Sequence, residues 1–536
     1  MKNENKKPRA SRGREADARS MHLQLAIAAV LAVSSTGVAV AQSMGTPYQS
    51  SSRAMYGDGL GQGELPKGGR FEPRIDTTLQ YVSNMTAAPD DEPQVDTAGL
   101  EAAPGFYGSW SSETATAAID YSLVARWWED SDYNDVSHRL AANGEWHLAP
   151  EWFYVTGQAS YGNAILDPAE GLNYGGIGVF NPANLSEVAT ASLSPVLSHT
   201  FGDFQAVALY QYGRTWYLDE GLGVEPDIGF VNNDQDSEDQ SARASFGTAA
   251  DAGHRLTGTV YYDWQKSEYE TALPYQYERA GVDMGLRLGR SITLLGEYGQ
   301  ESDLDENTTK GGLDSEYWNG GLRYEPNDKT LIEGRYGNRF FGDYWSAQIS
   351  HRARLLEFGA TYSEEPTVET RRLSLGDFDP GSLPPGLPPG VDFSFLVSSP
   401  YVARDASATV RAVGSRTTLT LTGFQYERDY INALRQDETN LGVTFGINRT
   451  LASNLSADFN VTYNDYERTT LGDIFGEELV TNDKDTTAVL RLNRETGKNL
   501  TLSIEGGYLT RTGDTSEYDG WWAALRARWA PGQRTN

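Results

Sequence analysis

Apolar and polar residues alternate at every second position from Phe71 to Trp529, and no other feature of the chain restricts its fold as strongly. In one example, Leu256, Gly258, Val260, Tyr262 and Trp264 are separated by threonine, tyrosine and aspartate. A period of two gives a β-strand one apolar and one polar face. Similar segments recur along the chain, among them Ile292–Tyr298, Leu356–Tyr362, Leu441–Ile447, Leu455–Tyr463 and Leu500–Tyr508.

The number of such segments predicts a β-barrel. We count about 22 of them, with a range of about 18 to 24. After residue 41, no stretch approaches the ~18 consecutive apolar residues of a transmembrane helix, so any passage through a membrane must use strands. A mean hydropathy of −0.52 beside 11 % aromatic residues fits a wall with one face on lipid and one on water. We predict an all-β chain with one transmembrane antiparallel β-barrel over 71–529 and a C-terminal tail over 530–536.

The connections between these segments alternate in length. Short ones are expected near Gly202-Asp203, Asp251–Gly253, Gly289-Arg290, Asn327, Arg352, Gly414-Ser415 and Gly497. Longer ones are expected at Thr86–Asp96, Ala164–Glu187, Tyr217–Ser237, Glu301–Ser315, Glu365–Tyr401 and Glu467–Lys484. Outer-membrane barrels have short periplasmic turns and longer extracellular loops. The pattern therefore predicts the outer membrane of a Gram-negative-type bacterium, with both ends of the chain in the periplasm.

The N-terminal residues have the pattern of an export signal. Seven basic residues between Lys2 and Arg19 precede an apolar region from Leu23 to Val40. Ala39-Val40-Ala41 is a small-x-small cleavage site, so we predict a signal peptide over 1–41 that is cut between Ala41 and Gln42. A start at Met21 and an uncleaved anchor helix are the alternatives. The Gly/Ser-rich segment 42–70 is predicted to be flexible and periplasmic, and too short for a folded plug domain.

Charge and motifs exclude several functions. The net charge is −30, whereas binding to nucleic acid requires basic surface. The absence of cysteine excludes disulfides, cysteine zinc sites and covalent haem attachment. His138, His147, His199, His254 and His351 lack metal-ligand spacing, and no hydrolase or phosphate-binding motif stands in its required context. We predict no enzyme activity, no metal and no cofactor. The acidic loop residues either keep the loops soluble or bridge to lipopolysaccharide through divalent cations.

The inward-facing side of the strands carries opposite charges in neighbouring positions. If Val282, Met284 and Leu286 face lipid, then Asp283 and Arg287 face the lumen. The same alternation turns Glu297, Arg323, Glu333 and Arg335 inward from the following strands. This lumen charge ladder is interpreted either as a structural ladder that rigidifies the wall or as a charged constriction that selects solutes.

The predicted loop Glu365–Tyr401 is a candidate for narrowing the pore. It contains Pro384, Pro385, Pro388 and Pro389, followed by the apolar residues Phe393 and Phe395. Prolines make such a loop stiff, and the aromatic residues make it apolar enough to fold inward. An exposed loop that contacts a partner is the alternative.

Three stretches resemble a known family. They are Leu197–Arg214 (LSHTFGDFQAVALYQYGR), His351–Glu365 (HRARLLEFGATYSEE) and Tyr401–Tyr430 (YVARDASATVRAVGSRTTLTLTGFQYERDY). Together they resemble the PEP-CTERM-system-associated outer-membrane barrel family, whose members are encoded in exopolysaccharide and exosortase loci. The resemblance implies a barrel in a polysaccharide context and supplies no catalytic motif.

Three functional hypotheses follow. The first is a barrel for exopolysaccharide secretion, as conduit or supporting component, whose inward tyrosines such as Tyr261 stack on sugar rings. The second is a general diffusion porin for small solutes. The third is a plugged barrel that acts as a surface or periplasmic interaction scaffold. The expected partners are outer-membrane lipid, lipopolysaccharide and the barrel-assembly machinery; the first hypothesis adds exopolysaccharide and periplasmic export proteins.

Overall fold

The computed structural model describes residues 68–531 except 90–91, 131–132, 150–151, 166–184, 219–235, 250–252, 270–272, 305–308, 369–399, 432–436, 472–477 and 515–516. This part of the chain contains 22 β-strands. Among these described residues, no helix is long and apolar enough to span a membrane. The strands are β1 (Gly68–Val82), β2 (Thr97–Ser111), β3 (Ala115–Trp128), β4 (Asp135–Ala149), β5 (Phe153–Ile165), β6 (Leu185–Phe201), β7 (Phe204–Tyr217), β8 (Ser237–Thr248), β9 (Leu256–Tyr269), β10 (Tyr275–Arg287), β11 (Ile292–Glu301), β12 (Ser315–Asn327), β13 (Thr330–Arg339), β14 (Gly342–Arg352), β15 (Leu356–Thr367), β16 (Tyr401–Val413), β17 (Thr417–Tyr430), β18 (Glu438–Ala452), β19 (Leu455–Leu471), β20 (Glu478–Thr496), β21 (Leu500–Gly513) and β22 (Tyr518–Trp529).

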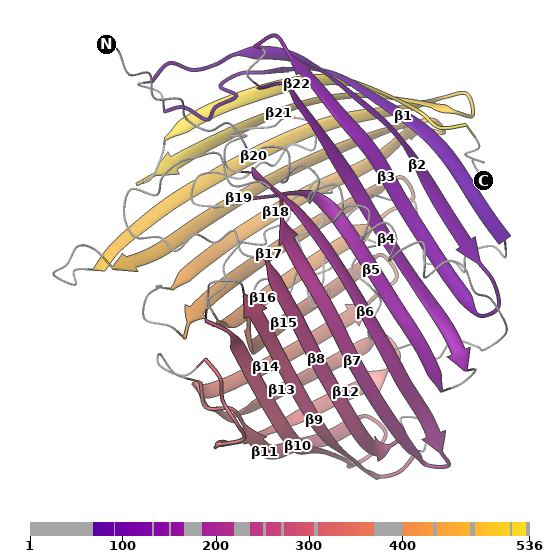
Figure 1. The fold of residues 1–536 in the computed structure, drawn as a ribbon, viewed down its shortest axis with the longest axis vertical. Helices are drawn as coiled ribbons and strands as arrows, with labels where there is room; N and C mark the ends of the chain where they lie inside the picture. The colour runs from indigo at the N-terminus through magenta and orange to yellow at the C-terminus, as the bar shows by residue number, and fades with distance from the viewer. Residues whose placement is uncertain are drawn as a thin grey trace, which may run out of the picture.

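The strands close into one antiparallel barrel. Each strand pairs with the next along the chain, and β1 pairs with β22 from Ile75 opposite Trp529 to Val82 opposite Trp522. Figure 1 shows the resulting wall, in which the first and last strands lie side by side. Closure removes every free sheet edge, which is the condition for strands to cross lipid. The predicted fold class and strand number are therefore confirmed, although β1 begins at Gly68 and not at Phe71.

Connection lengths alternate as the sequence predicts. Turns such as Gly202-Asp203, between β6 and β7, lie at one end of the barrel. Gly202 has a φ of 62°, a conformation that glycine adopts without steric cost in a two-residue hairpin turn. The long connections all lie at the opposite end. The shortest connection there is as short as a periplasmic turn, because only Phe340 and Phe341 join β13 to β14, where both strands are short.

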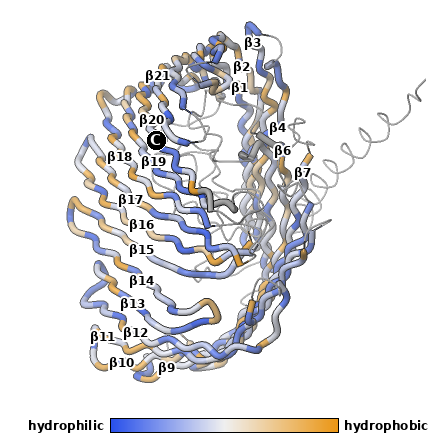
Figure 2. Tube along the Cα trace, turned by 90° about the vertical axis from the view of Figure 1, so that its left-hand side faces the viewer, coloured by the Kyte–Doolittle hydropathy of each residue, from blue (hydrophilic) through white to orange (hydrophobic). Residues whose placement is uncertain are grey.

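The two faces of the wall differ as the alternation requires. On β9, Leu256, Val260 and Tyr262 are exposed to the outside, whereas Tyr261 is buried on the inside. Figure 2 shows the same alternation of hydrophobic and hydrophilic residues along most strands. In water, an exposed apolar band around a whole molecule would be unfavourable, so this band faces lipid.

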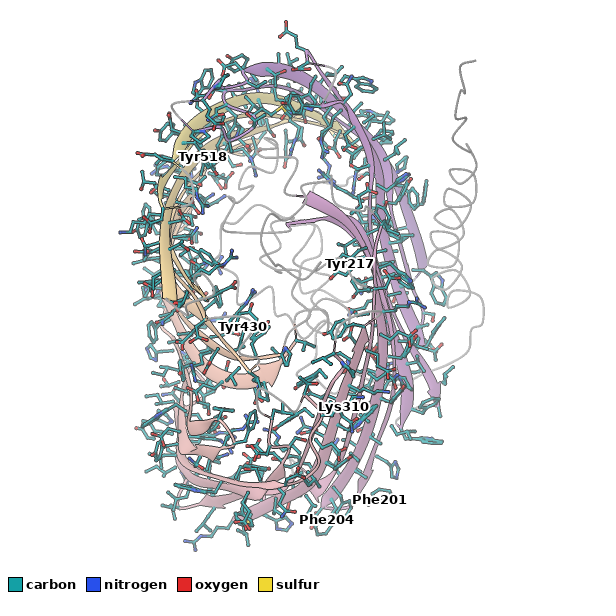
Figure 3. All side chains as sticks on the ribbon, turned by 60° about the vertical axis from the view of Figure 1, so that its left-hand side comes forward. Phe201, Phe204, Tyr217, Lys310, Tyr430 and Tyr518 are labelled. Atoms are coloured by element: carbon teal, nitrogen blue, oxygen red, sulfur yellow. The ribbon has the colours of Figure 1, made fainter. Side chains whose placement is uncertain are left out.

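Outward aromatic side chains border the apolar band at both ends. Phe201, Phe204 and Phe246 lie at the short-turn end, and Phe204 stacks on Phe246 with ring centroids 5.7 Å apart. Figure 3 shows Phe201 and Phe204 outside the elongated ring of strands and Tyr430 inside it. At the long-loop end, the ring centroids of Tyr336 and Trp345 lie 4.4 Å apart. Such aromatic girdles mark the membrane interfaces, and the chain is an outer-membrane β-barrel whose short turns face the periplasm.

An apolar cluster stabilises the seam where the barrel closes. Val82 of β1, Leu509 of β21 and Trp522 of β22 are almost fully buried and pack together. Met85, from the connection after β1, joins this cluster at the long-loop end. The seam is therefore held by side-chain packing as well as by backbone pairing.

The assignment of faces makes a stability prediction. Leu421 on β17 is 48 % exposed and faces lipid, whereas its neighbour Thr420 faces the lumen. Leu421→Arg near the bilayer midplane should destabilise the folded barrel by about 2–4 kcal/mol. Thr420→Arg, the matched control, should cost little because its guanidinium reaches water in the lumen. Urea unfolding in lipid vesicles measures both, and equal losses would show that the faces are assigned wrongly.

Candidate functional site in the barrel lumen

Five of the six residues of the predicted lumen charge ladder meet on one wall of the lumen. Asp283 on β10 stands opposite Glu297 on β11, and Arg323 on β12 stands opposite Glu333 on β13. Arg323 Nε donates to Glu333 at 2.6 Å. The sixth residue, Arg287, is exposed near the short-turn end, and no ion pair joins it to the other described members of the ladder.

Arg335 is the centre of the ladder. Its Nη1 lies 2.7 Å from an Asp283 oxygen and 3.8 Å from Glu297, while its Nε lies 3.1 Å from Glu333. Asp283 and Glu297 are like charges directly opposite each other, an arrangement that is unfavourable without a counter-ion. Arg335 supplies that counter-ion from β13. The ladder is therefore a connected network across four strands.

A second network of aromatic and charged side chains adjoins the ladder toward the long-loop end. The hydroxyl groups of Tyr261 and Tyr317 are hydrogen-bonded to each other and to Glu297. The guanidinium of Arg279 lies 5.4 Å above the ring of Tyr261 and 6.0 Å above that of Tyr317. Arg243 lies 5.7 Å above the Tyr261 ring. Tyr261 is inward as predicted, but it is 6 % exposed, so its ring is not free to stack on a sugar.

Two glycines make room for Tyr317. Gly281 and Gly299 are cross-strand partners on the inner face of β10 and β11. A Cβ atom at either position would collide with the Tyr317 hydroxyl group or with neighbouring backbone. The absence of side chains here lets the tyrosine lie flat against the wall and reach Glu297.

The most deeply buried charges of this wall lie at its long-loop end. Arg339 on β13 donates to Glu301 on β11 at 2.9 Å and to the Tyr277 hydroxyl group at 2.7 Å. The side chains of Arg339 and Glu301 are 2 % and 0 % exposed. Phe340 N donates to the second Glu301 oxygen at 2.9 Å, so the carboxylate is held from two directions.

Sequence reasoning missed these additional lumen residues, although the signal for them was present. Tyr277 and Arg279 share the parity of Asp283 on β10, and Glu301 shares that of Glu297 on β11. Tyr317 and Arg339 likewise share the parity of Arg323 and Arg335. Extending the ladder along each strand would have identified them as inward-facing, but not their contacts.

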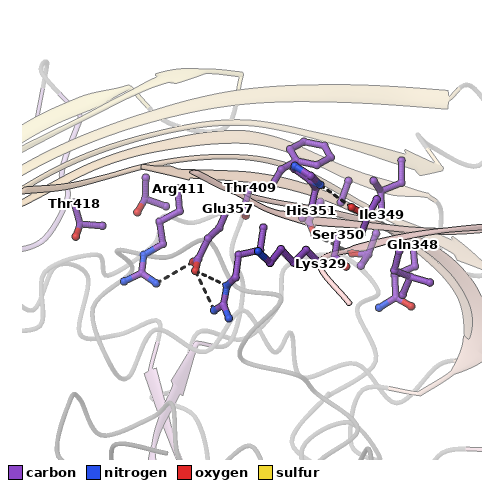
Figure 4. Close-up of a pocket in the computed structure, with 18 of the residues that line it drawn as sticks. Lys329, Gln348, Ile349, Ser350, His351, Glu357, Thr409, Arg411 and Thr418 are labelled. Carbon is purple, nitrogen blue, oxygen red and sulfur yellow. Dashed lines mark hydrogen bonds and ion pairs between the residues drawn. The ribbon is translucent and has the colours of Figure 1, made fainter. Parts of the chain in front are cut away.

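A cavity of about 1480 Å³ lies on the adjoining wall at the short-turn end. Its lining combines hydroxyl and amide groups from β14 to β19, among them Thr409, Thr418, Thr420, Asn448 and Asn460, with charged residues such as Glu325 and Lys329 near the turn between β12 and β13. Figure 4 shows Arg411 beside Glu357 at one edge of this cavity. Glu357 also accepts from Arg352 at 3.0 Å, so the two arginines share one carboxylate.

Several residues considered in the sequence analysis are not part of this site. Within the described ranges, no group of three or more histidine, cysteine, aspartate or glutamate residues is placed to hold a metal ion. His138 is hydrogen-bonded to Tyr121 and His351 to Thr330, each at 2.9 Å. The cleavage site at Ala41 and Gln42 and the proline-rich segment from Pro384 to Phe395 lie outside the described residues.

Comparison with known proteins gives similarity of architecture. No family model matches the sequence, and no curated protein matches it. The siderophore receptor of Acinetobacter baumannii is 9 % identical, with a TM-score of 0.47 over 87 % of this chain and 81 % of the receptor. The ferric enterobactin receptor of Pseudomonas aeruginosa is 10 % identical, with a TM-score of 0.44 over 85 % of this chain and 80 % of the receptor. An iron transporter of Neisseria meningitidis is 9 % identical, with a TM-score of 0.38 over 87 % of this chain and 82 % of the transporter. These values identify no ligand for this chain.

Proposed function

We propose that this outer-membrane barrel serves exopolysaccharide secretion, as the conduit or as a supporting component of it. The observation that carries the proposal is the lumen, whose walls present hydrogen-bonding side chains to a cavity that is lined by the turns and strand ends of the periplasmic side. A polysaccharide needs such a surface, because each sugar hydroxyl loses hydrogen bonds to water on entering a passage. The resemblance of three sequence stretches to a family from exopolysaccharide loci supports the same function.

A general diffusion porin is the second candidate, and the lumen charge ladder favours it. Arg323, whose side chain is 41 % exposed, and Asp283, at 36 %, present opposite charges to the lumen. Charged rings and ladders in a channel select small ions and solutes. The third candidate, a plugged scaffold, predicts no ion conductance from the reconstituted barrel.

In-frame deletion of the gene, with complementation, tests the first candidate. The expected result is that extracellular polysaccharide disappears or accumulates in the periplasm and returns on complementation. Ordinary growth and an intact outer membrane, assayed by antibiotic sensitivity, are the controls for a general envelope defect. Unchanged secretion in the deletion strain would refute the proposal and favour the general porin.

A further inference from the structure

The two lumen walls differ in chemistry, and we propose that the neutral one, on β16 to β19, binds a neutral saccharide chain where it enters the barrel from the periplasm. This inference rests on the proposed function and adds to it a site and a substrate class. The wall formed by β10 to β13 carries the charge ladder, whereas the periplasmic half of β16 to β19 carries mainly serine, threonine and asparagine on its inner face, with Arg411 and Asp458 as the charged residues there.

A row of threonines crosses this neutral wall. Thr409, Thr422, Thr444, Thr462 and Thr487 are direct cross-strand partners on β16 to β20. Thr409 is hydrogen-bonded to Thr422 at 3.0 Å and Thr444 to Thr462 at 3.2 Å. The row is the buried floor of the site, because Thr422 and Thr444 are each 1 % exposed.

The next inward positions toward the periplasm are more open and line the cavity. Thr420 on β17 and Asn460 on β19 are half-buried, and Thr418 lies beyond Thr420 toward the short turn. Among the described residues, none is hydrogen-bonded to the side chain of Thr418, Thr420 or Asn460. Hydroxyl and amide groups each both donate and accept. They therefore match the hydroxyl groups of a sugar, which also do both.

The charged residues that line the cavity balance one another, with Arg290, Lys329, Arg352 and Arg411 on one side and Glu325, Asp328, Glu357 and Asp458 on the other. Glu357 contacts both Arg352 and Arg411, at 3.0 and 3.4 Å. Asp458 accepts from the amides of Asn448 and Asn493. A lining without net charge gives a charged chain no overall electrostatic attraction, whereas its hydroxyl and amide groups can bind a neutral one. The site therefore favours an uncharged polyhydroxylated chain over an acidic one.

Calorimetric titration of the purified full-length mature barrel tests this site. The probe is maltohexaose, a neutral linear oligosaccharide, and the comparison is hexagalacturonate, an acidic one. The detergent is an amine oxide, because alkyl glycosides would present sugars of their own. The test variant is Thr418→Val/Thr420→Val, which keeps side-chain shape and removes both hydroxyl groups. The matched control is Thr501→Val, an inward threonine on β21 that does not line the cavity.

We expect maltohexaose to bind more tightly than hexagalacturonate. Each lost hydroxyl should weaken binding about fivefold, and Thr501→Val should leave it unchanged. Thr420→Ser, which keeps the hydroxyl group, should retain wild-type affinity, and a wild-type circular-dichroism spectrum of the double variant shows that its loss of affinity is not misfolding. No binding of maltohexaose, tighter binding of hexagalacturonate, or equal weakening by the control overturns the inference. If maltohexaose does not bind but gene deletion still abolishes secretion, the site is wrong and the proposed function stands.

Discussion

Arg339→Ala should destabilise the barrel by about 3–5 kcal/mol, the largest effect of any single substitution considered for this protein. The guanidinium is buried against Glu301, Tyr277 and Glu365, at 2.9, 2.7 and 3.2 Å. Its removal leaves the Glu301 carboxylate, which is 0 % exposed, without its counter-ion in a water-poor part of the wall. Urea unfolding in lipid vesicles measures the loss directly.

Two further variants separate loss of the ion pair from loss of packing. Arg323→Ala removes an arginine of the same wall whose side chain is 41 % exposed, and it should cost only about 0–1 kcal/mol. The double variant Arg339→Leu/Glu301→Leu removes both charges and should recover most of the lost stability. If the double variant is no more stable than Arg339→Ala, the unpaired carboxylate is not the cause.

Arg323→Glu should shift the ion selectivity of the reconstituted barrel toward cations, which is the largest functional effect expected from one residue. Arg323 projects from β12 beside Glu333, so the substitution turns a neutral pair into two negative charges on the lumen wall. A negative lumen wall attracts cations and repels anions. The measurement is the reversal potential in a tenfold KCl gradient, where a shift of several millivolts toward the potassium equilibrium potential is expected.

The control for this experiment has the same charge change on the opposite face. Arg494 on β20 pairs in register with the outward Leu502 and is exposed outside the barrel. Arg494→Glu should therefore leave the reversal potential unchanged. An unchanged potential in Arg323→Glu, with conductance present, would place Arg323 outside the permeation path and favour the structural interpretation of the charge ladder. A barrel without any conductance would favour the scaffold.

The fold could be predicted because its main signals are local. Alternation assigns each residue to a face without knowledge of its partners, so Val282 and Asp283 are placed correctly from sequence alone. Turn and loop lengths then fix which strand ends share a side of the membrane. The two-residue connection at Phe340–Phe341 escaped prediction because β13 and β14 are short, and their turn carries no proline or asparagine signal.

The signal peptide, its cleavage after Ala41 and the role of the proline-rich segment remain predictions, because they concern residues that the structure does not describe. The predicted bounds of the N-terminal segment 42–70 are corrected at the C-terminal end, because Gly68–Arg70 belong to β1. The partners expected from the sequence, lipopolysaccharide and periplasmic export proteins among them, also remain predictions.

The sequence by itself determined the strand period, the inner and outer faces and the end at which each loop lies. Only the tertiary structure decided which inward residues meet. Arg335 reaches Asp283 across β11 and β12, and Arg339 reaches Glu301 across β12. The threonine row on β16 to β20 exists because five strands share one register. A period of two fixes the direction of a side chain, but its height on the wall depends on the stagger between strands, which is set only when the whole barrel closes.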